Sequence, residues 1–173
     1  AFRMSLFPGF SQRKVRTSGA TINLRMAGQG EPVLLLHGYP QTHAMWHKVA
    51  PELARDYTVV CADLRGYGDS SKPKGVPGHA NYSKRAMAQD MAEVMDALGH
   101  RSFHAVGHDR GGRVAHRLAR DHGRRVASLT VLDISPTLKM YHNTNLQFAK
   151  AYYHWFFLIQ EYPLPERMLQ GEV

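Results

Sequence analysis

The sequence predicts an α/β protein with a mostly parallel sheet and helices on both faces. Short apolar runs alternate with segments whose apolar residues recur at helical spacing, and the runs end at glycines or polar loops. Alternation of this kind is typical of parallel strands joined by helical crossovers. After the first hairpin, the expected strands cover residues 33–36, 57–62, 102–106 and 126–134.

The N-terminal elements follow from turn residues and apolar runs. Residues 15–26 are broken at Ser18-Gly19, which predicts two short strands in a hairpin. Residues 33–36 form an unbroken apolar run that stops at His37-Gly38, as expected of a buried strand that ends in a loop. A short helix is expected over residues 45–53, before the next apolar strand at 57–62.

The later elements are bounded by capping residues. Ser83 can cap a helix whose apolar positions continue to Leu98, and Gly99 ends it. Gly107 closes the strand at 102–106, and a helix is expected over residues 113–122. Beyond Pro136 the pattern changes, because residues 146–160 are aromatic-rich and helical with no strand after them.

Composition excludes several classes of protein. The chain has 173 residues, 43% of them apolar, which is typical of one soluble globular domain. No apolar run is long enough to span a bilayer and residues 1–10 do not resemble a secretion signal, so we expect a cytoplasmic protein without a membrane partner. The net charge is +8, but the basic residues are dispersed without an RNA-binding or zinc-finger motif, so nucleic acid is not an expected partner. The lone Cys61 can form no intramolecular disulfide.

The segment Gly107-His108-Asp109-Arg110-Gly111-Gly112 lies between a predicted strand and a predicted helix. It has the form of a nucleophile elbow, in which glycines permit a tight turn that exposes the central side chain. Here that side chain is a carboxylate, which needs no base before it attacks, so Asp109 could displace a leaving group from saturated carbon and form an ester. The alternative is an ordinary glycine-rich turn with a capping aspartate.

Two arginines follow the elbow within one helical turn. Arg110 and Arg113 can point toward Asp109, and two guanidiniums at a helix N-terminus favour a bound carboxylate. The alternative is a solvated arginine stripe along one helix face, and we adopt it for Arg117, Arg120 and Arg124. The predicted partner of Asp109 is therefore a small organic acid.

At these residues the chain resembles the haloacetate dehalogenases, which include fluoroacetate dehalogenase, within the α/β-hydrolase fold. Related epoxide hydrolases commonly have tryptophan where this chain has Arg110, which places the resemblance in the carboxylate-recognising branch. The resemblance is carried by residues 36–41, 44–46, 61–70, 107–113 and 132–137.

The resemblance implies roles for the core residues. Asp109 would attack the carbon that bears the halogen, and Arg110 and Arg113 would bind the substrate carboxylate. Asp133 would orient a histidine that activates water to hydrolyse the ester. The backbone N–H groups of Tyr39 and Arg110 would form the oxyanion hole.

The resemblance also implies a second domain. Residues 1–138 would form the N-terminal part of the hydrolase core, and residues 139–173 the first part of a helical cap. In that cap His154 and Trp155 would bind the departing halide through ring N–H groups, although ring packing alone is an alternative. No cofactor and no metal are implied, and homodimers are common in the family.

The catalytic histidine of the family would lie beyond Val173, so we expect this chain to be an incomplete dehalogenase. The strand at 126–134 would then be an uncovered sheet edge. Two other functions stay open: an epoxide hydrolase that shares the Asp109 nucleophile, and a fragment that binds carboxylates without turnover.

Overall fold

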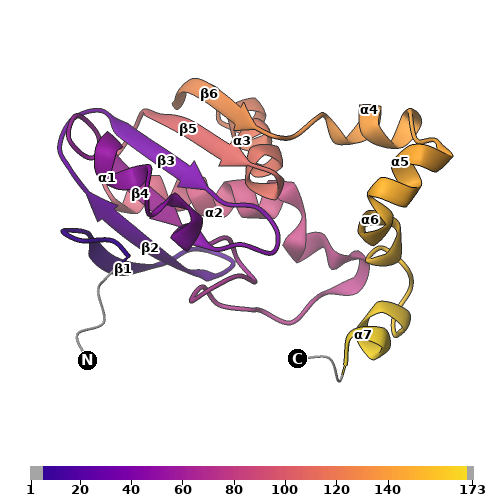
Figure 1. Cartoon of the computed structure of the whole chain (residues 1–173). Coiled ribbons are helices and arrows are strands. Elements are labelled where there is room, and N and C mark those ends of the chain that lie inside the picture. The colour runs from indigo at the N-terminus through magenta and orange to yellow at the C-terminus, as the bar shows by residue number, and fades with distance from the viewer. Residues whose placement is uncertain (1–5, 171–173) are drawn as a thin grey trace. The chain divides into compact units, whose positions relative to one another are not determined.

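The computed structural model describes residues 6–170, and its centre is a six-stranded sheet in the order β1-β2-β4-β3-β5-β6 (Figure 1). The strands are β1 (Ser11–Arg16), β2 (Thr21–Ala27), β3 (Pro32–Leu36), β4 (Thr58–Ala62), β5 (Phe103–His108) and β6 (Val126–Leu132).

The pairing of the strands confirms the predicted sheet. β3 pairs in parallel with β4 and β5, and β5 pairs in parallel with β6. The first two strands form the predicted antiparallel hairpin, with Val15 opposite Ile22, and β2 joins the sheet antiparallel to β4. The carboxyl ends of β3, β4, β5 and β6 therefore meet at one edge, where ligand sites of open α/β sheets lie.

The prediction of one continuous helix over residues 45–53 is wrong. It forms as two pieces, η1 (His43–Trp46) and α1 (Ala50–Leu53), and Pro51 lies in the first turn of the second. Proline has no N–H to donate to the preceding turn, so it suits a helix start and not a helix interior. A further short helical segment, η2 (Pro77–Tyr82), precedes the next long helix.

Two long helices cover one face of the sheet. α2 (Lys84–Ala97) begins as predicted, because the Ser83 hydroxyl oxygen accepts a hydrogen bond from the N–H of Ala86 at 3.2 Å. α3 (Arg110–Asp121) begins at Arg110 and not at Arg113, since Gly111 and Gly112 form its first turn and no separate loop. The preceding strand likewise runs to His108, two residues past its expected end.

Side chains of alternate strand residues build two cores, one on each face of the sheet. Leu34 and Leu36 of β3 pack with the apolar residues of α2 and α3. Leu35, on the other face, packs with Trp46 and Ala50 of the short helices η1 and α1. Figure 1 shows α2 and α3 behind the sheet and α1 in front of it, which confirms helices on both faces.

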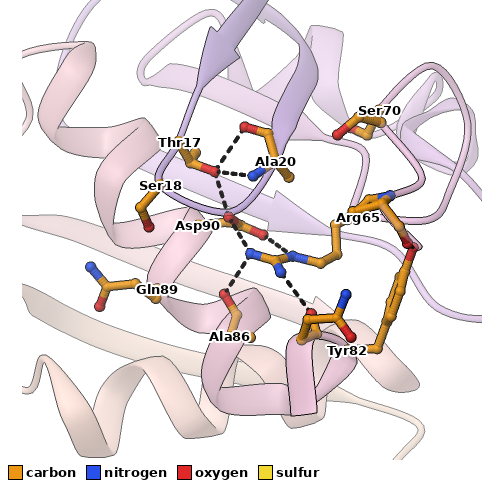
Figure 2. A network of polar contacts seen from close by, with 12 residues as sticks. Thr17, Ser18, Ala20, Arg65, Ser70, Tyr82, Ala86, Gln89 and Asp90 are labelled. Carbon is orange, nitrogen blue, oxygen red and sulfur yellow. Dashed lines mark hydrogen bonds and ion pairs between the residues drawn. The ribbon is translucent and has the colours of Figure 1, made fainter. Parts of the chain in front are cut away.

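A buried ion pair fixes the start of α2 to the rest of the core unit (Figure 2). Arg65 donates from Nε to Asp90 at 2.7 Å, and its guanidinium also donates to the carbonyl of Asn81 at 2.6 Å. The Thr17 hydroxyl donates to the other carboxylate oxygen of Asp90 at 2.6 Å. The contacts join the first hairpin, the segment after β4 and the first turns of α2.

The chain divides into two compact units, 1–134 and 135–173, and the boundary lies slightly before the expected one at residue 138. Residues 135–170 of the second unit contain four short helices: α4 (Thr137–His142), α5 (Leu146–Ala151), α6 (Tyr153–Phe157) and α7 (Leu164–Leu169). The helical run expected over residues 146–160 is interrupted at Tyr152, whose φ of −117° and ψ of 35° are not helical. Of the helices in residues 6–170, none has the length and apolar character to cross a membrane.

The last strand, β6, lies at the edge of the sheet and its side chains are mostly exposed. Val131 is 45% exposed and Leu132 is 40% exposed. An apolar strand with free backbone groups along one side is a surface for further pairing. The uncovered edge expected from the sequence is therefore present in the described chain.

Candidate active site

Asp109 lies on the turn between β5 and α3, at the carboxyl edge of the sheet. Its φ of 50° and ψ of −118° are strained for a residue with a Cβ. The turn is held on both sides: the Asp109 N–H donates to the carbonyl of Leu132 at 3.2 Å, and its own carbonyl accepts from the N–H of Arg113 at 3.3 Å. The predicted elbow geometry is thus present, with the carboxylate half-buried.

Two glycines permit the close packing of this turn. A Cβ at Gly38 would lie 2.5 Å from the Cβ of Asp109, so only glycine leaves room for the carboxylate there. A Cβ at Gly111 would collide with the backbone carbonyls of Leu36 and His37. The first turn of α3 therefore rests directly on the end of β3, which fixes the direction of the Asp109 side chain.

The Tyr39 N–H donates a hydrogen bond to Oδ1 of Asp109 at 2.9 Å. Tyr39 belongs to the loop after β3, so that loop and the elbow form one site. Arg110, the other residue predicted to supply an oxyanion-hole N–H, is the first residue of α3 and follows Asp109 directly. The structure brings the Tyr39 N–H to the carboxylate, and the catalytic role of both backbone groups stays a prediction.

The two predicted carboxylate-binding arginines lie on the first turn of α3 and are half-buried. The guanidinium carbon of Arg110 lies 5.4 Å from the centre of the Tyr39 ring, so this side chain is held over the same loop. Arg113 follows one turn later. Two positive charges are therefore carried by the first helical turn after Asp109.

Asp133 directly follows β6 and also has a positive φ, of 48°. The peptide carbonyl before it, that of Leu132, accepts the hydrogen bond from the Asp109 N–H. The Asp133 side chain is exposed, at the same sheet edge as Asp109. A backbone hydrogen bond thus joins the segment of the predicted orienting acid to the segment of the predicted nucleophile.

His154 and Trp155 are neighbours on α6, in the second unit. Both rings are half-buried, and each has its centre 6.2 Å from the centre of the Tyr152 ring. Trp155 also lies 6.1 Å from Tyr141, centre to centre. The pair forms part of an aromatic cluster within its own unit, and its halide-binding role stays a prediction.

His37, which directly follows β3, is fully buried and holds two backbone segments together. The N–H of Leu64 donates to its Nε2 at 3.0 Å, so the ring proton lies on Nδ1, which is 2.8 Å from the carbonyl of Gly38. Burial lowers the pKa of His37 despite the opposing effect of the Gly38 contact. The ring is therefore a neutral positioning group for the loop that carries Tyr39.

Asp63, for which no role was predicted, is a fully buried carboxylate directly after β4. It accepts hydrogen bonds at 2.8 Å from both the backbone N–H and ring Nδ1 of His43, and at 2.9 Å from the Asn23 amide. Burial alone would raise the pKa of Asp63, but these donors outweigh it and lower the pKa to about 2. The position of an acidic residue immediately after a buried strand could have indicated a role for Asp63. Its function in the structure is to hold the loop at 42–46 against the sheet edge.

Lys84, the first residue of α2, was also missed. It is half-buried, and its electrostatic neighbours are Arg110, Arg113 and Asp109. The pKa of Lys84 is lowered to about 8, chiefly by burial and then by the two arginines, while Asp109 acts in the opposite direction. A helix start is the only local signal at this position, so the sequence alone did not connect it with the elbow.

Among residues 6–170, no three His, Cys, Asp or Glu side chains are grouped so that they could hold a metal ion. Three cations, Lys84, Arg110 and Arg113, gather at the elbow beside Asp109, and the exposed Asp133 lies at the same sheet edge. The arrangement can therefore hold a small anion near a carboxylate nucleophile.

The sheet order and the turn at Asp109 are those of an α/β hydrolase. The chain belongs to the alpha/beta hydrolase fold family, whose model matches residues 31–165. The fold expected from the sequence motifs is confirmed.

Individual relatives narrow the comparison beyond the fold family. The chain is 56% identical over 167 residues to fluoroacetate dehalogenase of Burkholderia sp, which covers 96% of this chain and 55% of that protein. It is 41% identical over 121 residues to soluble epoxide hydrolase of Corynebacterium sp. (strain C12), covering 70% of this chain and 41% of that protein. The crystal structure of an α/β hydrolase from Nostoc sp PCC 7120 has a TM-score of 0.90 and 65% identity, covering 92% of this chain and 55% of that chain.

These matches confirm the resemblance to the haloacetate dehalogenases stated from the motifs. The chain spans about half the length of the relatives it matches.

Proposed function

We propose that this chain carries the nucleophile and carboxylate-binding half of a hydrolytic dehalogenase that acts on a haloacetate. The observation that carries the proposal is Asp109 on a strained elbow, followed within one helical turn by Arg110 and Arg113. The identity to fluoroacetate dehalogenase of Burkholderia sp supports it.

In the first step, Oδ2 of Asp109 attacks the carbon that bears the halogen, and the carbon–halogen bond breaks with its electron pair leaving on the halide. The choice of oxygen follows from the hydrogen bonds, because Oδ1 already accepts from the Tyr39 N–H. The arginines hold the substrate carboxylate and so align the carbon with the nucleophile.

In the second step, water attacks the carbonyl carbon of the new ester and releases glycolate. Oδ1 is then the ester carbonyl oxygen and takes up negative charge, so the N–H groups of Tyr39 and Arg110 act as the oxyanion hole. The resemblance assigns activation of the water to the family's catalytic histidine, oriented by Asp133. The halide contacts are assigned to His154 and Trp155 in the same way.

The test is the intact mass of the chain after incubation with chloroacetate, with chloride release measured in the same tube. We expect a carboxymethyl ester that maps to Asp109 and about one chloride per chain. Asp109→Asn should abolish both, and Arg113→Lys should weaken capture because an ammonium cannot make the paired hydrogen bonds of a guanidinium. A folded chain, as judged by circular dichroism, that gives neither ester nor chloride overturns the proposal.

An epoxide hydrolase is the second candidate, favoured by the identity to soluble epoxide hydrolase of Corynebacterium sp. (strain C12). Such an enzyme would use the same Asp109 nucleophile on a neutral substrate. Styrene oxide in place of chloroacetate separates the two, because a neutral epoxide gains nothing from the arginines. Reversible binding of carboxylates with no ester from either reagent would instead indicate a binding fragment.

A further inference from the structure

α2 and α3 begin at the same edge of the sheet. Each of them precedes a parallel strand, β5 and β6 respectively, so each helix must run from the carboxyl edge back to the amino edge of the sheet. The two helices pack side by side on one face (Figure 1). Lys84 is the first residue of α2 and Arg110 the first of α3, so both cations lie at the edge that carries Asp109.

This arrangement is electrostatically unfavourable without a bound anion. A helix N-terminus carries partial positive charge and normally attracts acidic side chains. Neither α2 nor α3 has an acidic residue in its first turn, and both begin with basic residues. Lys84 is therefore repelled by Arg110 and Arg113, and the one carboxylate that attracts it is Asp109, the N-cap residue of α3.

The backbone of Lys84 is held in place at the start of α2. The Arg65 guanidinium donates to the carbonyl of Asn81 before it and to Asp90 in the second turn after it (Figure 2). The Ser83 hydroxyl caps the same turn. The buried network thus fixes the backbone of Lys84 while its side chain stays half-buried.

We propose that Lys84 is a third cation of the anion site, and that it restricts the electrophiles captured by Asp109 to negatively charged ones. The inference deepens the proposed function by naming the residue that sets substrate charge. Lys84 and the two arginines it interacts with outnumber the Asp109 carboxylate, so a bound haloacid still leaves positive charge to attract the departing halide. A neutral electrophile gains no such stabilisation.

The other charged groups near α2 have partners elsewhere. Arg85, the next residue, is 73% exposed and its Nε lies 3.6 Å from the carboxylate of Asp121. On η2, which packs against α2, the Tyr82 hydroxyl donates to the carbonyl of Pro73 at 2.6 Å and His79 is exposed. Arg85→Met is therefore the matched control, because it removes a neighbouring positive charge outside the site.

The first experiment compares ester formation at Asp109 with chloroacetate and with chloroacetamide, its neutral analogue. We expect Lys84→Met to slow capture of chloroacetate about tenfold and to change capture of chloroacetamide less than about twofold. Lys84→Arg should keep the wild-type rate at pH 7, and Arg85→Met should behave as wild type. Equal effects of Lys84→Met on the two reagents overturn the proposal.

The second experiment measures equilibrium binding of acetate by saturation-transfer NMR between pH 6.5 and 9.5. Because the pKa of Lys84 is about 8, the wild-type affinity should fall as pH rises through that value. Lys84→Arg should retain affinity above pH 8, since guanidinium stays charged, and Lys84→Met should bind weakly throughout. Acetate binding that depends on Lys84, without any ester at Asp109, would contradict the dehalogenase function but would still support an anion site at Lys84. Wild-type pH dependence in Lys84→Met would overturn the Lys84 site.

Discussion

Gly38 and Asp109 approach so closely that a methyl group on Gly38 would lie 2.5 Å from the Cβ and 2.7 Å from Oδ1 of Asp109. The contact joins the loop after β3 to the elbow after β5. Because the Tyr39 N–H donates to the same carboxylate oxygen, a shift of either segment moves the nucleophile relative to its hydrogen-bond donor.

Gly38→Ala should therefore slow ester formation at Asp109 with chloroacetate by roughly 10- to 100-fold, because small displacements of a nucleophile are costly. The rate of adduct formation by mass spectrometry checks this. Gly75→Ala is the control, since a Cβ there would meet only the exposed His79 ring, at 3.4 Å. An unchanged rate in Gly38→Ala would mean that the loop can yield without moving the carboxylate.

Asp63→Asn should destabilise the core unit. The pKa of Asp63 is about 2 in the folded chain, below its ordinary value of 3.8, so the ionised form stabilises the fold above pH 3.8 and this contribution is lost as pH falls toward 2. The shift corresponds to about 2 kcal/mol. Urea unfolding at pH 7 should show a loss of that order.

The same variant should also have a flatter dependence of unfolding free energy on pH between 4 and 2. Asp69→Asn is the matched control, because Asp69 is exposed and contributes only its backbone N–H to Asp63, at 3.1 Å. If Asp63→Asn and wild type lose stability equally over this range, the titration of Asp63 does not contribute to acid unfolding.

Asp90→Asn should cost roughly 3 kcal/mol of stability, because it leaves the buried Arg65 guanidinium without its counter-charge. The double variant Arg65→Met with Asp90→Leu should recover part of this loss, since it removes both buried charges. Glu52→Gln tests the opposite case: Glu52 pairs with Arg55 at 2.7 Å on the exposed surface and should contribute less than about 1 kcal/mol. All three are measured by urea unfolding.

Val131→Lys should reduce self-association of the chain. Val131 is 45% exposed on β6, an edge strand that can pair with another chain, and a lysine there opposes such pairing. Sedimentation velocity over a range of concentrations measures the effect, and Gln29→Lys in an exposed loop controls for the added charge. Equal association of the two variants would exclude β6 as the contact.

Local patterns predicted much of the fold because most of the decisive signals are short in sequence. The hairpin, the Ser83 cap and the elbow at Asp109 each depend on residues within a few positions of one another. The start of α3 was placed too late because paired glycines favour a turn, and only the contact of Gly111 with the end of β3 shows why they are helical here. The break at Tyr152 likewise has no proline or glycine to signal it.

Residue spacing predicted only the part of the candidate site that lies in one segment, and Tyr39 and Asp133 were added by the family resemblance. Asp109, Arg110 and Arg113 share a turn, so their spacing was sufficient. The sheet order brings Asp63 to the edge that carries the elbow, and the packing of α2 against α3 brings Lys84 there. No local sequence pattern contains either relationship.

The positive φ of Asp109 creates a conflict between stability and activity at one position, because the residue needed as nucleophile is strained in this backbone conformation. Glycine adopts that backbone conformation without strain, so at a salt concentration that screens the nearby cations Asp109→Gly should yield a chain that melts at a higher temperature and has lost its nucleophile. A library of variants selected for heat resistance alone would be drawn toward that substitution. Directed evolution of a more thermostable form of this chain therefore has to select for ester formation at Asp109 in every round, because thermal selection by itself favours loss of the nucleophile.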